Sequence, residues 1–148
     1  MKLRILAALT ALVASGSSLA SSVDASEIDG VIKYLDLTSF RNSVGPLRMP
    51  GKTTFADYGF VRVEKTVSGA KLVRDDKGWT MGFSIISASP TSLRLCFYDR
   101  GLALPGDMRA PSYNATSALL VSKSRRGRWA AKQVPAGFAN CQNDPAAA

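Results

Sequence analysis

Apolar and polar residues alternate most regularly between residues 78 and 100. The apolar members fall on odd positions on both sides of a Ser/Ala/Pro/Thr turn: Trp79, Met81, Phe83, Ile85, Leu93, Leu95 and Phe97. In a β-strand, alternate side chains point to the same face, so this pattern predicts a hairpin whose odd positions are buried. Ile86 interrupts the alternation where the turn is expected to begin. This hairpin is expected to form the centre of the core.

Shorter alternating runs lie on both sides of the central hairpin. Upstream, residues 60–64 and 70–74 surround a Ser-Gly turn, with strand-forming residues beginning at Phe55. Downstream, residues 115–123 and 128–134 surround a polar, basic turn. Together with the central hairpin, these runs predict five or six antiparallel strands.

Residues 26–35 have the spacing of a short helix. Apolar residues recur at helical intervals at Ile28, Val31, Ile32 and Leu35. Ser26 is the candidate N-cap, because an acidic residue follows three positions later. Gly30 weakens the prediction of a helix, and a strand over residues 31–37 is the alternative.

Cys96 and Cys141 are the only cysteines in the chain. In an oxidising compartment such a pair most simply forms one structural disulfide. Closing this loop stabilises the fold by about 4 kcal/mol in the chain-entropy model. The predicted fold class is α+β, with a single antiparallel sheet of five or six strands, a short N-terminal helix and one disulfide. An all-β barrel or sandwich is the alternative, favoured if residues 26–37 are extended.

The first residues have the pattern of a secretory signal peptide. Lys2 and Arg4 precede a short apolar segment, and small residues offer cleavage after Ala20 or, as an alternative, after Ala25. The apolar segment is about half the length needed to span a bilayer, so no transmembrane helix is expected after processing. The exported chain is expected to be one globular domain over residues 26–143 with a frayed tail over residues 144–148. Its expected location is the periplasm or the extracellular space.

The formal net charge is +8, and none of the 148 residues is histidine. The absence of histidine excludes Ser-His-Asp and Cys-His catalysis and the HExxH zinc motif. The chain also lacks the glycine motifs that bind phosphate and the Asp-rich loops that bind metal ions, so neither a cofactor nor a metal is expected. An exported basic protein is expected to meet anionic envelope components rather than nucleic acid.

The sharpest polar feature is the turn over residues 123–129. Arg125, Arg126 and Arg128 lie next to Trp129 in this segment. Guanidinium groups bind phosphate or carboxylate bidentately, and an aromatic ring beside them can stack on a ligand. These four residues are therefore the candidate binding site. A solvated turn whose tryptophan packs into the sheet is the alternative interpretation.

Three carboxylates, those of Asp57, Glu64 and Asp99, lie at or beside predicted strands. A glycosidase needs two carboxylates that face each other across a sugar, and nothing in this spacing demands such a pair. Aspartates at strand ends more commonly accept backbone hydrogen bonds.

The sequence favours a small exported, non-catalytic binding or accessory module. Such a module would recognise an anionic envelope component, or another envelope protein, through the basic turn, and its chemistry is compatible with peripheral contact with a membrane. A structural or inhibitory protein that binds one protein partner through an apolar patch is the first alternative. A carboxylate-dependent hydrolase is the second alternative, and enzymatic activity is the less favoured expectation.

Overall fold

The computed structural model of the chain describes residues 23–41, 43, 48–76, 78–101, 113–139 and 141. These residues contain one helix followed by six strands: α1 (Ala25–Tyr34), β1 (Arg62–Lys65), β2 (Gly69–Val73), β3 (Trp79–Ala88), β4 (Ser92–Gly101), β5 (Tyr113–Ser122) and β6 (Ala130–Gln133). The predicted signal peptide over residues 1–20 and the predicted tail over residues 144–148 lie outside the described residues.

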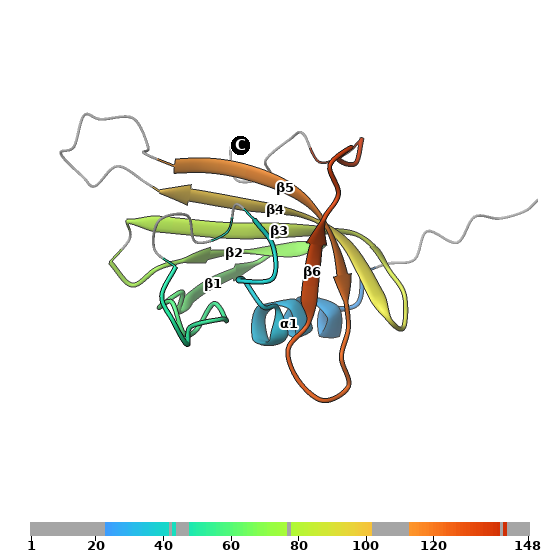
Figure 1. Cartoon of the computed structure of the whole chain (residues 1–148), viewed down its shortest axis with the longest axis horizontal. Helices are drawn as coiled ribbons and strands as arrows, with labels where there is room; N and C mark the ends of the chain where they lie inside the picture. Colours follow the sequence, from blue (N-terminus) through green and yellow to red (C-terminus); the bar gives the residue numbers. More distant parts are fainter. Residues whose placement is uncertain are drawn as a thin grey trace, which may run out of the picture.

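The six strands form one open sheet in which each strand pairs with the next along the chain (Figure 1). All five pairings are antiparallel. This arrangement confirms the predicted α+β class with a single antiparallel sheet. Because β1 and β6 are opposite edges rather than neighbours, the described strands do not close into a barrel.

β3 and β4 form the central hairpin, and each strand is 10 residues long. From Trp79 to Ile85 their register places the odd positions of both strands on one face, with Phe83 opposite Phe97. The turn does not begin at Ile86 as the interrupted alternation suggests. A bulge at this point shifts the register by one residue, and β3 continues to Ala88.

The odd face of the sheet packs against α1 and against the segment between α1 and β1 (Figure 1). The largest fully buried side chains come from all three parts: Phe55, Phe83, Phe97, Leu35, Leu37, Leu72, Met81, Leu93, Leu95, Leu119 and Val31. Phe40 and Phe55 lie in the connecting segment and pack against Phe97. The ring centroid of Phe97 is 5.0 Å from that of Phe40 and 6.3 Å from that of Phe55. The core therefore depends on residues outside the regular elements as well as on the sheet.

Strand structure begins at Arg62, and the prediction that it begins near Phe55 is wrong. The segment around Phe55 forms turns, in which the Asp57 carboxylate accepts hydrogen bonds from the backbone N–H groups of Thr53 and Thr54. Phe55 is buried because it packs on the core from a turn, and an apolar residue in a turn has the same sequence pattern as one in a strand.

The predicted helix is present, but its N-cap is Asp24 rather than Ser26. The Asp24 carboxylate accepts a hydrogen bond of 3.0 Å from the backbone N–H of Ser26. The buried face of α1 carries Ile28, Gly30 and Val31. Because Asp24 caps α1, cleavage of the chain after residue 20 would keep the cap, whereas cleavage after residue 25 would remove it.

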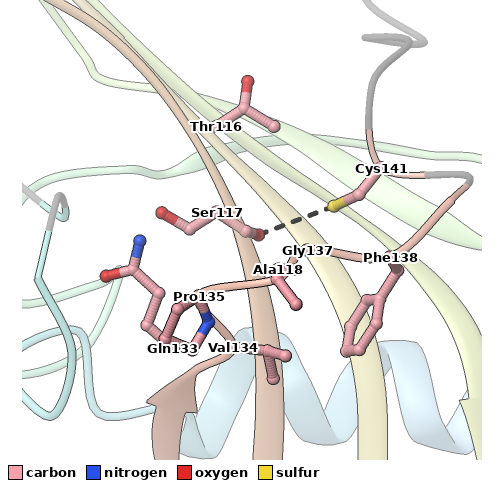
Figure 2. A pocket seen from close by; sticks show the side chains of 10 residues that line it. Thr116, Ser117, Ala118, Gln133, Val134, Pro135, Gly137, Phe138 and Cys141 are labelled. Carbon is pink, nitrogen blue, oxygen red and sulfur yellow. Dashed lines mark hydrogen bonds between the residues drawn. The ribbon is translucent and has the colours of Figure 1, made fainter.

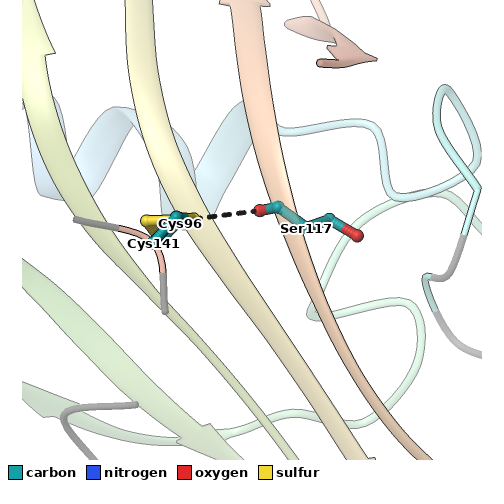
Figure 3. Close-up of a disulfide and its surroundings, with 3 residues drawn as sticks. All are labelled: Cys96, Ser117 and Cys141. Atoms are coloured by element: carbon teal, nitrogen blue, oxygen red, sulfur yellow. Dashed lines mark hydrogen bonds between the residues drawn. A yellow bond between two sulfur atoms is a disulfide. The ribbon is translucent and has the colours of Figure 1, made fainter. Parts of the chain in front are cut away.

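The even face of the sheet carries the disulfide between Cys96 on β4 and Cys141 (Figure 3). The Cα atoms of the two cysteines are 5.3 Å apart. Tyr98 and Ala118 are buried beside the disulfide, and Phe138 packs against this cluster. The predicted disulfide thus attaches the segment after β6 to the middle of the sheet.

We expect replacement of both cysteines, Cys96→Ala with Cys141→Ala, to lower the free energy of unfolding by about 2–4 kcal/mol, because the open loop raises the entropy of the unfolded chain. Urea denaturation monitored by circular dichroism measures this loss. Reduction of the wild-type protein should reproduce it, while the double variant should not respond to the reductant. Equal stability of the oxidised and reduced wild-type proteins would contradict the prediction.

Candidate functional site

The basic turn joins β5 to β6 and projects beyond α1 (Figure 1). Arg125, Arg126 and Arg128 are all exposed. Among the described residues, neither Arg125 nor Arg126 makes an ion pair, while Arg128 lies 4.0 Å from a carboxylate oxygen of Asp36. Two guanidinium groups at the tip are therefore free of neutralisation by the described carboxylates.

Trp129 attaches the turn to the end of α1. Its backbone N–H donates to the carbonyl of Tyr34 over 2.7 Å, and its carbonyl accepts from the N–H of Asp36 over 2.9 Å. The indole ring lies 5.8 Å from the Tyr34 ring and covers Gly30. Trp129 thus packs against α1, and this contact anchors the end of the turn that carries the arginines.

Tyr34 and Lys33 extend the basic turn onto α1, and the sequence pattern did not single them out. Tyr34 is 37% exposed, and the Lys33 ammonium lies 5.1 Å from the centre of its ring. Both residues lie off the apolar face of the helix, and the sequence could therefore indicate that they are exposed. Only the contact between Tyr34 and Trp129 shows that they lie beside the turn. We call the five residues Lys33, Tyr34, Arg125, Arg126 and Arg128 the basic end.

Lys123 differs from the arginines of the same turn because its side chain is only 11% exposed. Its ammonium pairs with Glu27 of α1 over 2.5 Å and donates to the Ser89 carbonyl over 2.7 Å. It also lies 5.7 Å from the centre of the Trp129 ring. Lys123 therefore joins the helix, the β3–β4 turn and the β5–β6 hairpin, and its charge is already matched within the fold.

The three candidate carboxylates of a hydrolase lie in different environments. Asp57 accepts hydrogen bonds in the turns before β1, and Asp99 is fully buried on the odd face, where it accepts from the Trp79 indole N–H. Glu64 is exposed on the even face, because the strand registers align it with Lys71 and then with Tyr98. The sheet thus separates Glu64 from Asp99, and these carboxylates do not form a facing pair.

The described surface has two hollows of the size of a ligand site. One, of about 380 Å³, lies beside the disulfide and is lined by Thr116, Ser117, Gln133, Phe138 and their neighbours (Figure 2). The other, of about 590 Å³, lies between the segment at residues 39–41 and β6. Neither is lined by a carboxylate, and the described residues contain no group of three or more acidic or cysteine side chains placed to hold a metal ion.

Comparison of the chain with protein-family models, with curated proteins and with solved structures gave no match. The described part of the chain has no helix long and apolar enough to cross a membrane. The chemistry of the described surface is therefore the guide to function. At the basic end, Arg125 and Arg126 have no carboxylate partner among the described residues, and Trp129 of the same turn packs on the partly exposed Tyr34 ring.

We expect Gly30→Ala to destabilise the protein, although alanine normally favours a helix by about 1 kcal/mol over glycine. An added Cβ would lie 2.3 Å from Cη2 of Trp129, so the indole ring must move. The expected loss is about 1–3 kcal/mol in urea denaturation. In a Trp129→Ala background the same substitution should become stabilising. A gain in stability from Gly30→Ala in the wild-type protein would show that the contact does not constrain the turn.

Asp57 should make the stability depend on acid pH. Hydrogen bonds from the backbone N–H groups of Thr54 and Thr53 lower the pKa of the Asp57 carboxyl from 3.8 to about 2. Because the folded-state pKa is depressed, its contribution to stability is complete above pH 3.8 and is lost as the pH falls towards 2.

Asp57→Asn keeps an acceptor oxygen but does not titrate. We therefore expect this variant to lose less stability than the wild-type protein between pH 4 and pH 2. The melting temperature, measured by thermal denaturation at each pH, reports this difference. Asp57→Ala should lower the melting temperature by a few degrees at neutral pH, because two N–H groups lose their acceptor. Identical acid profiles for the wild-type and Asp57→Asn proteins would rule out this role.

Proposed function

We propose that this chain is a small exported, non-catalytic binding module that recognises an anionic component of the cell envelope through its basic end. The observation that carries the proposal is the pair Arg125 and Arg126, which are exposed and not neutralised by a described carboxylate, on a turn whose Trp129 packs on Tyr34. Guanidinium groups suit bidentate contacts with phosphate or carboxylate, and a partly exposed tyrosine suits the boundary between polar and apolar surroundings.

Export is supported by the signal-peptide pattern of the first residues and is compatible with the Cys96–Cys141 disulfide. We further propose cleavage after residue 20, because this site leaves the Asp24 cap of α1 in the mature chain. In such a compartment the abundant polyanions are lipid phosphates and acidic glycans rather than nucleic acids, so the shared chemistry is an anionic group displayed on a surface.

A binding role is favoured over catalysis because the described acidic side chains have structural partners. Asp24 caps α1, Asp57 orders a turn, Asp99 accepts from Trp79, and Glu27 pairs with Lys123. A hydrolytic site requires titratable groups that converge on a substrate. The basic end contains only cations and a phenol, which bind anions without a bond being broken.

The test is co-sedimentation of the oxidised protein with vesicles of anionic phospholipid and with vesicles of zwitterionic phospholipid. We expect binding only to the anionic vesicles at low salt, and strong weakening at about 0.5 M salt, where charges are screened over a few ångströms. Arg126→Glu should weaken binding at least about tenfold, because each cation near an anionic surface contributes about 1 kcal/mol. Arg125→Glu with Arg126→Glu should abolish binding.

Lys71→Glu is the control for net charge, because it changes the charge as Arg126→Glu does but lies on β2, four strands from β6. It breaks the exposed pair of Lys71 with Glu64, and such a surface pair contributes only about 0–1 kcal/mol to stability. It should bind anionic vesicles nearly as the wild-type protein does. Arg128 is left unchanged because it lies near Asp36. A parallel assay on an immobilised acidic glycan distinguishes the two sources of anionic groups.

Binding that survives the double arginine substitution would show that the basic end is not the site. Binding to isolated envelope fractions that resists salt would instead support the alternative of a protein partner recognised through apolar surface. The absence of binding to vesicles, glycan and envelope fractions alike would overturn the proposal.

A further inference from the structure

The edge of the sheet formed by β1 exposes apolar residues. All four residues of β1 are exposed. Three valines in and beside the strand are among the most exposed large apolar residues described: Val61 at 69%, Val63 at 38% and Val67 at 94%. No described strand pairs with the outer side of β1. An exposed edge of this kind is a template for pairing with another strand.

The hydrogen-bond pattern shows which backbone groups of β1 face outwards. The N–H of Thr66 donates to the Gly69 carbonyl over 2.9 Å, which makes this pair a hydrogen-bonded pair of the β1–β2 ladder. Hydrogen-bonded and non-bonded pairs alternate in an antiparallel ladder, so Val63 and Lys65 direct their N–H and C=O groups away from β2. Val61 offers only its carbonyl, because its N–H donates to Gly59.

The side chains of β1 carry opposite charges two residues apart on one face. Arg62 and Glu64 both lie on the even face of the sheet. Arg62 makes no ion pair with a described residue, and Glu64 lies 3.7 Å from Lys71. Val63 lies between them on the other face. The order basic, apolar, acidic is complementary to itself when the strand is reversed.

We propose that β1 pairs in an antiparallel manner with β1 of a second copy of this chain, about a two-fold axis at Val63. In this register each Arg62 faces Glu64 of the second copy, and the two Val63 side chains face each other. The Val63 N–H groups bond to the opposite Val63 carbonyls, and each Lys65 N–H bonds to a Val61 carbonyl. The pairing therefore satisfies four outward N–H groups, forms two ion pairs and buries apolar surface.

A second copy fits this edge better than an unrelated strand because the charge pattern is complementary to itself. A two-fold axis places each Arg62 opposite Glu64 of the other copy, so the same short segment supplies both members of each ion pair. A strand of four residues buries less surface than the ~800 Å² per partner of a standard interface, so the dimer forms only as the protein concentration rises. The contact lies on the edge opposite β6 and does not depend on the basic end.

Sedimentation equilibrium of the oxidised protein over a wide range of concentration tests the proposal. The wild-type protein is expected to shift from monomer to dimer. Arg62→Glu and Glu64→Arg should each weaken self-association at least about tenfold, because both cross-strand pairs change from attraction to repulsion. The double variant with both substitutions should dimerise as the wild-type protein does, because the reversed order is again complementary to itself.

Mixing the two single variants gives the sharpest result. One variant presents two acidic residues on this face and the other presents two basic residues, so an equimolar mixture should form a heterodimer although neither variant dimerises alone. Val63→Pro should abolish dimerisation in all backgrounds, because it removes an outward N–H without removing a bond to β2. Circular dichroism should show that these exposed substitutions leave the fold intact.

A wild-type protein that stays monomeric at the highest concentration reached would overturn the proposal. So would a dimer that both single charge reversals leave unchanged, since the contact would then lie elsewhere on the molecule. A protein that dimerises but does not bind anionic vesicles would contradict the proposed function of the basic end and leave the dimer proposal intact. The two proposals can therefore be rejected independently.

Discussion

The packing of phenylalanine side chains on the central hairpin is the interaction on which the remaining structure depends. Phe83 and Phe97 face each other on β3 and β4, and Phe40 and Phe55 cover them from the connecting segment. Burial of each such side chain contributes roughly 1.5–3 kcal/mol. Since a slip of one residue would move all these side chains to the opposite face, the aromatic cluster also sets the register of the flanking strands.

Contacts on both faces of the sheet then attach the outer segments to this centre. On the even face the disulfide joins residue 141 to β4. On the odd side Lys123 and Trp129 join the β5–β6 hairpin to α1 through Glu27 and Gly30. A largely buried ion pair adds little net stability, because desolvation of the charges offsets their attraction. Its effect is to fix the position of the hairpin, and with it the direction in which the arginine turn projects.

The charged groups are divided between structural and surface roles according to their neighbours. The carboxylates of Asp24 and Asp57 accept backbone hydrogen bonds, and that of Asp99 accepts from an indole. Arg125 and Arg126 of the turn have no ion-pair partner among the described residues, whereas Arg128 lies 4.0 Å from Asp36. Arg125 and Arg126 therefore remain available to an anion at the surface, as the proposed function requires.

The sequence by itself determined the sheet and the disulfide. Alternation of apolar residues over 78–100 is a local property, and the two cysteines have no other partner, so both predictions needed no knowledge of distant contacts. The chemistry of the arginine turn was likewise visible, because Arg125, Arg126 and Arg128 are neighbours in the chain.

Only the tertiary structure decided how distant residues are combined. The sequence could not show that Trp129 covers Gly30, that the Tyr34 ring packs on the Trp129 ring, or that β1 is an edge of the sheet, because each depends on the positions of separate elements. The same limit explains the corrected details at Phe55 and Asp24. Burial and capping both follow from where the chain turns, and a turn is decided by which backbone groups find partners in the folded protein.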